Sequence, residues 1–210
     1  MYKNIIFDFD GTIADSFNFL LKVVNSNPSK YGIDGIDANE IPKLRSLSMR
    51  YIFREFNINV FKIPRFVKML REEMRNNLSD LALIEGMAEI ISGLQSHGYK
   101  IYILTSNDRR IVTAYLKMHK ISGILDIYSG RKLFKKHRLI KKMLRKKHLR
   151  KKETLYVGDE IRDIVACEKA GIDIASVTWG FNDSATLAKK SPKFLVDTPE
   201  QLKNVILEGR

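Results

Sequence analysis

Cysteine is almost absent from this 210-residue sequence, which contains only Cys167, so no disulfide can form within the chain. Long apolar runs are absent too, and no stretch of sequence reaches the roughly 18 residues that a membrane-spanning helix requires. The first fifteen residues include Asp8, Asp10 and Asp15, where a signal peptide has an uninterrupted apolar run. We therefore expect a cytoplasmic protein with no membrane partner, in which Cys167 is a small, buried packing residue.

Acidic residues are missing from one segment, 131–152, which holds 13 lysines and arginines. The rest of the chain has 24 basic and 24 acidic residues, so the net charge of +13 belongs to this segment. Its apolar residues, among them Ile140, Met143 and Leu144, recur at nearly helical spacing, which favours a core helix with a basic outer face. An alternative is a protein that binds nucleic acid or another polyanion through this segment. Because aromatic residues are not interleaved there for base stacking, we expect no more than weak nonspecific contact with nucleic acid.

Apolar residues make up 44% of the chain, enough to fill the core of one compact domain that carries a modest insertion. Short apolar runs predict buried strands, and helical patterns follow several of them. The predicted strands are 3–9, 100–104, 154–157, 172–177 and 193–196, and the clearest helical patterns are 111–119 and 161–170. This alternation predicts an α/β fold with a Rossmann-like parallel sheet and helices on both faces, whose ligands lie beyond the carboxyl ends of the strands.

Between residues 17 and 79 the pattern changes to one with little strand signal. Apolar residues recur there at helical spacing over 41–56 and 61–78. We predict that 17–79 is a helical domain inserted into a core domain formed by 1–16 and 80–210. Its basic residues could bind an anionic substrate, but in amphipathic helices such residues usually form a solvated face, which is our interpretation. These residues are Lys43, Arg45, Arg50 and Arg54.

Two carboxylates follow the first predicted strand, in the sequence Asp8-Phe9-Asp10-Gly11-Thr12. On extended backbone a spacing of two directs both side chains to one side, and Gly11 lets the chain turn directly afterwards. One carboxylate could then attack a substrate while the other transfers protons. For these residues alone, an ordinary Asp-Gly turn is the alternative interpretation.

A second acidic cluster, Gly158-Asp159-Glu160-Ile161-Arg162-Asp163, opens a predicted helix after another strand. Acids four residues apart lie on one helix face near its positive end, and such carboxylates suit a hard cation. Magnesium takes only a few oxygens from protein, so Asp8, Asp159 and the backbone carbonyl of Asp10 would suffice beside water and phosphate. Taken alone, this cluster also fits an ordinary helix cap.

Hydroxyl and backbone N–H groups follow a third strand at Thr105-Ser106-Asn107. At the beginning of a helix such groups form a receptor for a phosphate oxygen, although they also fit a simple N-cap. A lysine from the basic segment 131–152 could hold the nucleophile and the phosphoryl group together by offsetting their mutual repulsion.

Four elements in this order, DFDGT, ILTSN, a lysine and VGDEIRD, resemble the haloacid dehalogenase-like hydrolase superfamily, and in particular its phosphoglycolate-phosphatase-like members. The resemblance covers nearly the whole chain and includes the stretches 83–86 and 177–181. It implies a small phosphorylated metabolite as substrate and Mg²⁺ as cofactor. The insertion at 17–79 would then be a helical cap that closes over the substrate and excludes water.

By this resemblance Asp8 is the nucleophile that forms a phosphoaspartate, and Asp10 is the general acid and then the general base. Asp159 and Asp163 match the acids of the fourth motif. Asp159 is the first choice for a direct metal ligand beside Asp8 and Asp10, and Asp163 could act through water. Thr105 matches the hydroxyl of the second motif. The residues expected to bind the phosphate are Gly11, Thr12, Thr105, Ser106, Asn107 and Lys136.

The candidate for the lysine of the third motif is Lys136, which is also expected to be catalytic. Its surroundings, the sequence LFKKHR at 133–138, resemble the LFGKHR stretch of the family. Lys135 stands where glycine is usual, so Lys132 and Lys135 remain alternatives.

Asp10 bears on the reaction type, because dehalogenases and ATPases of this family tend to have another residue at its position. We predict a magnesium-dependent phosphatase acting on a small phosphate monoester, with a phosphomutase as the alternative. A receiver-type signalling domain also has a phosphorylatable aspartate, but the DFDGT motif and the long insertion argue against it. The sequence leaves open whether the substrate is phosphoglycolate, a sugar phosphate, a nucleotide or a modified metabolite, and whether the chain is a monomer or a homodimer.

Overall fold

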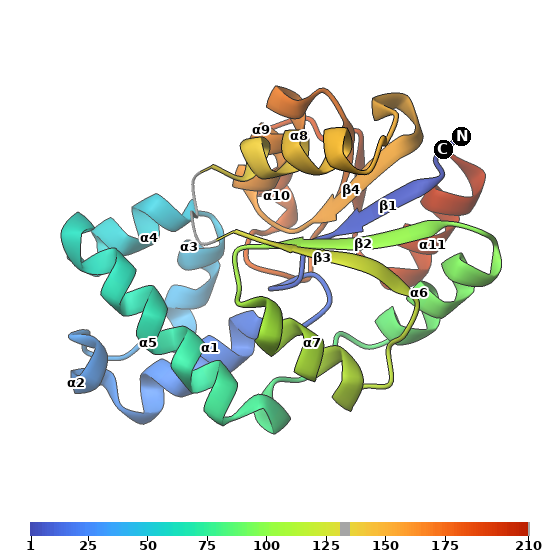
Figure 1. The fold of residues 1–210 in the computed structure, drawn as a ribbon. Helices are drawn as coiled ribbons and strands as arrows, with labels where there is room; N and C mark the ends of the chain where they lie inside the picture. The colour runs from blue at the N-terminus through green and yellow to red at the C-terminus, as the bar shows by residue number, and fades with distance from the viewer. Residues whose placement is uncertain (131–134, 210) are drawn as a thin grey trace.

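The computed structural model describes residues 1–130 and 135–209, and its centre is a six-stranded sheet in which each strand runs parallel to its neighbours (Figure 1). The order β3-β2-β1-β4-β5-β6 places β1 between β2 and β4. The strands are β1 (Asn4–Phe7), β2 (Lys100–Thr105), β3 (Ile124–Ser129), β4 (Thr154–Gly158), β5 (Asp173–Val177) and β6 (Phe194–Val196). The predicted α/β fold is therefore confirmed.

Helices cover both faces of this sheet, because the central strand is apolar on both sides (Figure 1). Along β1, Ile5 and Phe7 pack into one apolar core while Ile6 packs into the other, as the alternation of side chains in a strand requires. The first core is completed by α6 (Met87–Ser96), α7 (Arg109–Met118) and α11 (Pro199–Glu208). The second is completed by α8 (Lys136–Lys146), α9 (Ile161–Ala170) and α10 (Ser184–Ala188).

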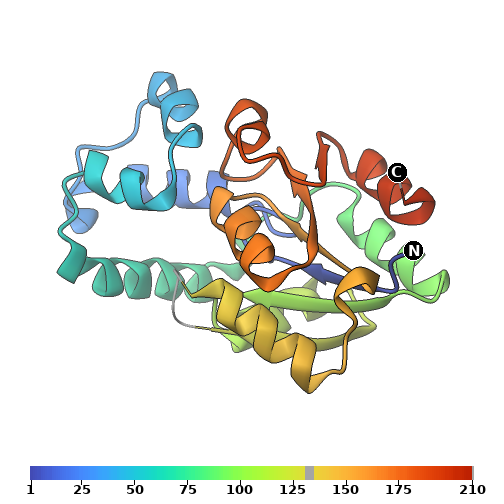
Figure 2. The same cartoon turned by 90° about the horizontal axis from the view of Figure 1, so that it is seen from above.

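The region 17–79 is helical, as predicted, and its helices lie together beyond the carboxyl ends of the strands in both views (Figures 1 and 2). Its α-helices are α1 (Ser16–Ser26), α2 (Pro28–Tyr31), α3 (Ile41–Arg45), α4 (Met49–Glu55) and α5 (Ile63–Asn76). The pattern over 41–56 is divided between two short helices, because the chain turns at Ser46–Ser48. A small apolar cluster around Val24, Tyr31 and Ile33 packs α1 and α2 against α5. That 17–79 forms a separate domain stays a prediction.

All five predicted strands are present within a few residues, but β3 was not predicted. Its sequence, ILDIYS, has a charged residue in the middle and a side chain, Leu125, that is 55% exposed. An edge strand is covered on fewer sides than a central one, so its apolar run is short and interrupted. The pattern that identified the other strands is therefore absent here.

Within the basic segment, α8 (Lys136–Lys146) has an apolar inner face, as predicted. Ile140, Met143 and Leu144 are buried against the sheet, while Lys141 and Lys142 are exposed. Cys167 is buried in the same core. Among the helices of the described ranges, none has the length and apolar character needed to cross a membrane.

Candidate active site

The carboxyl ends of β1 and β4 bring two acidic residues to the same edge of the sheet. These strands are parallel and in register, with Phe7 of β1 beside Val157 of β4. Asp8 follows Phe7 directly, and Asp159 follows the end of β4. Residues separated by about three quarters of the chain therefore meet where ligands of such sheets bind, as the sequence predicted.

Lys136, at the beginning of α8, lies between the carboxylates of Asp8 and Asp163. Its Nζ forms ion pairs with Asp8 and, at 2.5 Å, with Asp163, and only 6% of the lysine side chain is exposed. Burial raises the pKa of Asp8 to about 7, although the charge of Lys136 acts in the opposite direction. Burial also opposes the charge of Lys136, but the carboxylates of Asp163 and Asp8 outweigh it and raise the pKa of the lysine. The lysine is therefore charged and held against the predicted nucleophile.

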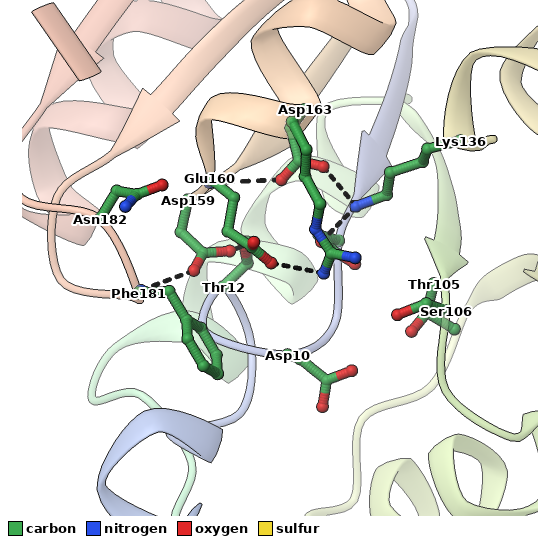
Figure 3. A network of polar contacts seen from close by, with 12 residues as sticks. Asp10, Thr12, Thr105, Ser106, Lys136, Asp159, Glu160, Asp163, Phe181 and Asn182 are labelled. Carbon is green, nitrogen blue, oxygen red and sulfur yellow. Dashed lines mark hydrogen bonds and ion pairs between the residues drawn. The ribbon is translucent and has the colours of Figure 1, made fainter. Parts of the chain in front are cut away.

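Asp159 is completely buried and is oriented by two donors. The hydroxyl of Thr12 donates to Oδ1 at 2.9 Å, and the backbone N–H of Phe181 donates to Oδ2 at 2.7 Å (Figure 3). Burial raises the pKa of Asp159 well above its usual range, and the carboxylates of Glu160 and Asp8 raise it further. Thr12, predicted as a phosphate ligand, is directed at Asp159 in this structure.

Two glycines allow the backbone to approach Asp159 closely. A Cβ at Gly11 would lie 2.1 Å from Oδ2 of Asp159, and Gly11 has a φ of 71°, which favours glycine. A Cβ at Gly180 would lie 2.2 Å from the same oxygen. The sequence predicts the turn at Gly11, but the close approach of Gly180 depends on the folded chain.

The carboxylates of Asp8, Asp159 and Asp163 could together hold a metal ion. Each offers one oxygen, and these oxygens lie within 4.8 Å of one another. Because burial raises the pKa of Asp8 and of Asp159, a divalent cation bound here would stabilise their charged forms. Carboxylate oxygens are also the ligands that hard cations such as Mg²⁺ prefer, so the donor set fits such an ion. The carboxylate of Asp10 is not part of this cluster.

Asp10 instead forms a pair with Asn107, across the ends of β1 and β2. The side-chain amide of Asn107 donates to Oδ1 of Asp10 at 3.1 Å. Burial raises the pKa of Asp10, while the hydrogen bond from Asn107 opposes this shift. A carboxyl group with a raised pKa keeps its proton to higher pH than an exposed carboxyl group does, which favours its use as a general acid.

The residues predicted to bind phosphate, Thr105, Ser106 and Asn107, lie at the end of β2. Thr105 is buried, and its hydroxyl oxygen accepts a hydrogen bond from the backbone N–H of Asn107 at 2.9 Å. The backbone carbonyl of Ser106 accepts a hydrogen bond from the guanidinium of Arg71, which comes from α5. The N-cap of α7 is Asp108, the residue that directly follows this stretch. The structure therefore brings the second motif to the edge of the sheet and joins it to the helical segment.

A partly buried ion pair between Glu160 and Arg162 was not anticipated from the sequence. The guanidinium of Arg162 bonds to the carboxylate of Glu160. The positive charge of Arg162 lowers the pKa values of Asp8 and Asp10, in opposition to their burial. The sequence contains both residues within its fourth motif, but only the fold brings the guanidinium near the residues that follow β1.

The interpretation of Arg45 as part of a solvated face was wrong. Its guanidinium donates to the backbone carbonyls of Thr178 and Gly180 at 2.7 and 2.8 Å. The side-chain amide of Asn182 donates to the backbone carbonyl of Arg45 at 3.0 Å. The side-chain oxygen of Asn182 accepts a hydrogen bond from the backbone N–H of Ile161 at 2.9 Å. A sequence pattern cannot distinguish this arginine from its exposed neighbours, because its partners are more than 130 residues away along the chain.

The other three basic residues that the sequence singled out in the helical segment behave as interpreted. Lys43 forms an exposed ion pair with Glu55 of α4. Arg50 and Arg54 are exposed. Of the alternative lysines for the third motif, Lys135 is exposed beside the beginning of α8, and Lys132 lies outside the described residues.

Comparison with known proteins gives relatives over nearly the whole chain. The family model of the haloacid dehalogenase-like hydrolases matches residues 5–177. The chain is 30% identical to a phosphoglycolate phosphatase of Synechococcus elongatus over 205 residues, which cover 97% of both sequences. It is 24% identical to the pyrophosphatase PpaX of Bacillus cereus over 205 residues, which cover 95% of this chain and 94% of that protein.

Solved structures share the fold at lower sequence identity. A crystal structure from Clostridium acetobutylicum, described as that of a predicted phosphatase, superposes with a TM-score of 0.84 at 19% identity. The match covers 99% of each chain. A haloacid dehalogenase-like family hydrolase from Streptococcus pneumoniae superposes with a TM-score of 0.80 at 21% identity, covering 100% of this chain and 99% of the other. At these identities the likeness is one of fold.

Proposed function

This chain belongs to the haloacid dehalogenase-like hydrolase family, and from that membership we propose that it is a magnesium-dependent phosphatase that hydrolyses a small phosphate monoester through a phosphoaspartate on Asp8. The observation that carries the proposal is the convergence of Asp8, Asp159 and Asp163 around one point beside Lys136. Relatives named phosphoglycolate phosphatase and pyrophosphatase support the reaction class.

In the proposed reaction the carboxylate of Asp8 attacks phosphorus. A bond forms between Asp8 and phosphorus as the bond from phosphorus to the ester oxygen breaks, and Asp10 gives its proton to the departing alkoxide. Asp10 then accepts a proton from water, whose oxygen bonds to phosphorus and releases phosphate from Asp8. The raised pKa of Asp10 suits the first of these steps.

Asp8, Asp159 and Asp163 would hold the divalent ion, which when bound supplies positive charge that reduces the repulsion between a carboxylate and a phosphate. Lys136 contributes a second positive charge next to Asp8. Thr12 and the N–H of Phe181 keep Asp159 in its orientation. We assign phosphate binding to Lys136 and to the groups of Gly11, Thr12, Thr105, Ser106 and Asn107.

We further propose that 17–79 acts as a cap domain, which closes over the substrate and excludes water. Polar contacts join it to the core: Arg45 bonds to the carbonyls of Thr178 and Gly180, and Arg71 bonds to the carbonyl of Ser106. An aromatic contact between Phe17 and Phe181, with ring centres 5.4 Å apart, lies at the same junction.

The test is a panel of phosphorylated metabolites assayed for released phosphate, with Mg²⁺ and after its removal by a chelator. We expect phosphate release that requires Mg²⁺ and that is lost in an Asp8→Asn variant. Conversion of a hexose phosphate into its isomer without release of phosphate would identify a phosphomutase instead. Salt-sensitive, submicromolar affinity for RNA together with full cellular function of Asp8→Asn would favour a polyanion-binding protein.

A further inference from the structure

A cavity of about 160 Å³ lies between the helical segment 17–79 and the edge of the sheet. Most of its lining side chains are apolar and come from the helices α1, α4 and α5 and the loops between them. Examples are Leu20, Val24, Ile33, Phe53, Phe66 and Val67. We refer to this space as the apolar cavity.

The apolar cavity is continuous with the candidate active site. Asp10, Ser106 and Asn107 belong to its lining, and they come from the loops that follow β1 and β2. Asp10 is the residue to which the proposed function assigns proton transfer to the departing alkoxide. The part of the substrate attached to that oxygen must lie next to Asp10, and the cavity is the space that begins there.

Charged groups lie at the end of the cavity that faces the sheet. Of the described residues, the helical segment contributes only one charged side chain to the lining, Arg71, and its guanidinium bonds to the carbonyl of Ser106. The core contributes Glu160 and Arg162, which pair with each other, besides Asp10. The basic residues Lys43, Arg45, Arg50 and Arg54 are not part of the lining.

This distribution of charge decides which leaving groups fit. An ionised group placed among these apolar side chains would lose its hydration without gaining a partner deeper in the cavity. An uncharged apolar group would gain free energy in proportion to the area that it removes from water. In size, an apolar cavity of roughly 150 Å³ is enough for one benzene molecule.

We propose that the apolar cavity holds the leaving group of the substrate, and that this enzyme prefers phosphate monoesters of uncharged, apolar alcohols about the size of one aromatic ring. The inference rests on the proposed phosphatase function and narrows its substrate class. It predicts that this chain does not prefer phosphoglycolate or pyrophosphate, the substrates in the names of its relatives. The leaving groups of both substrates are anionic.

Straight-chain alkyl phosphates test the cavity directly, with benzyl phosphate, phosphoglycolate and pyrophosphate assayed beside them. We expect kcat/KM to rise about fourfold for each added methylene and to stop rising near hexyl phosphate, when the cavity is full. Benzyl phosphate should exceed phosphoglycolate by at least about tenfold. A flat response to chain length, or phosphoglycolate or pyrophosphate as the best substrate, would overturn the inference and leave the phosphatase function intact.

A cavity-filling variant locates the effect. Val67→Phe places a larger side chain in the lining from α5, and Val60→Phe makes the same change at a position that is 67% exposed and outside the lining. We expect Val67→Phe to lower kcat/KM for hexyl phosphate by at least about tenfold and to leave that for methyl phosphate within about threefold. Val60→Phe should change neither. Equal effects of Val67→Phe on the two esters would contradict the proposal.

Binding to the unaltered protein gives a readout that depends neither on turnover nor on the folding of a variant. Calorimetry would compare benzylphosphonate with phosphonoacetate, which share the phosphonate and differ in carrying a phenyl ring or a carboxylate. We expect benzylphosphonate to bind at least about tenfold more tightly. Tighter binding of phosphonoacetate would instead assign the cavity to anions, through Arg71 or Arg162. Absence of hydrolysis of every monoester would refute the proposed function, whereas this comparison would still decide the chemistry of the cavity.

Discussion

Charged side chains are arranged in opposite ways in two regions of the molecule. One region is the acidic edge of the sheet, formed by Asp8, Lys136, Asp159 and Asp163, and the other is the helical segment 17–79. At the acidic edge all four ionisable side chains are buried, and each has partners that fix its position. In the helical segment most charged side chains are exposed, and the surface that faces the site is apolar. The first arrangement provides groups for a reaction on a phosphate, and the second provides a space whose shape and apolar character can select a substrate.

The two regions also differ in how they are held. The acidic edge is built on parallel strands and on the first turns of α8 and α9, so its geometry follows from the packed core. The helical segment is joined to the core by side chains such as Arg45 and Arg71, which bond to backbone carbonyls. Substitutions at the acidic edge should therefore affect chemistry strongly, and also stability where a buried charge is left without a partner. Substitutions in the helical segment should have graded effects.

The largest effect is expected for Asp8→Asn, which keeps the shape of the side chain and removes the nucleophile. Turnover should fall by at least about 10⁴-fold. The melting temperature should change little, because Lys136 keeps its ion pair with Asp163 and one of two neighbouring buried carboxylates becomes neutral. Phosphate release and thermal unfolding measure the two quantities. Asp34→Asn, at an exposed position of the helical segment, is the matched control and should leave both unchanged. Substantial turnover in Asp8→Asn would mean that the acidic edge does not carry the reaction.

The next effect concerns stability. Lys136→Met leaves Asp8 and Asp163 buried without the cation between them, and breaking a buried ion pair in this way costs about 3–5 kcal/mol. Urea unfolding in the absence of Mg²⁺ measures the loss. Lys142→Met, on the exposed face of the same helix, should change the free energy of unfolding by less than about 0.5 kcal/mol. Similar losses in both variants would mean that Lys136 is not a structural partner of the carboxylates.

Metal binding should be weakened at Asp159. Asp159→Asn should raise the Mg²⁺ concentration needed for half-maximal activity by about 10- to 100-fold, because one charged oxygen of the metal site is lost. In the unaltered protein, Mg²⁺ at 100 times its Kd should stabilise the fold by about 2.7 kcal/mol. Activity and thermal unfolding would both be followed across a Mg²⁺ titration. A protein whose melting temperature does not respond to Mg²⁺ would argue against a metal site between these carboxylates.

A smaller effect is expected where the helical segment meets the core. Arg45→Met removes charged hydrogen bonds to the carbonyls of Thr178 and Gly180, which we expect to cost about 2 kcal/mol. Because Gly180 also lies against Asp159, kcat/KM should fall by about tenfold with little change in the Mg²⁺ requirement. Steady-state kinetics and unfolding would measure both. If Arg45→Met behaved like a substitution of an exposed arginine, the junction would not depend on this residue.

The smallest effect is expected on the outer face of the helical segment. Arg54 is exposed and lies outside the lining of the apolar cavity, so Arg54→Gln should leave kcat/KM within about twofold for neutral and anionic substrates alike. A selective loss of activity toward phosphoglycolate would show that charge on this face contributes to substrate choice. Kinetics with phosphoglycolate and benzyl phosphate would detect such a loss.

Much of the fold and of the acidic edge could be predicted from local sequence patterns. Five strands were marked by apolar runs, and the acids that follow two of them were expected to meet because the strands are parallel. The edge strand β3 was missed because Asp126 interrupts its apolar pattern. Arg45 was misinterpreted because its partners come from a distant loop, and Gly180 was overlooked because the oxygen of Asp159 that it approaches is brought there by the fold.

The sequence by itself determined which groups are available and at which end of each strand they lie, because side-chain type and strand or helix pattern are properties of neighbouring residues. Only the tertiary structure decided that Lys136 lies between Asp8 and Asp163, that two donors orient Asp159, and that the helical segment leaves an apolar cavity beside Asp10. Each of these depends on distances between segments far apart in the chain, and such distances are fixed by packing of the whole core rather than by any local pattern.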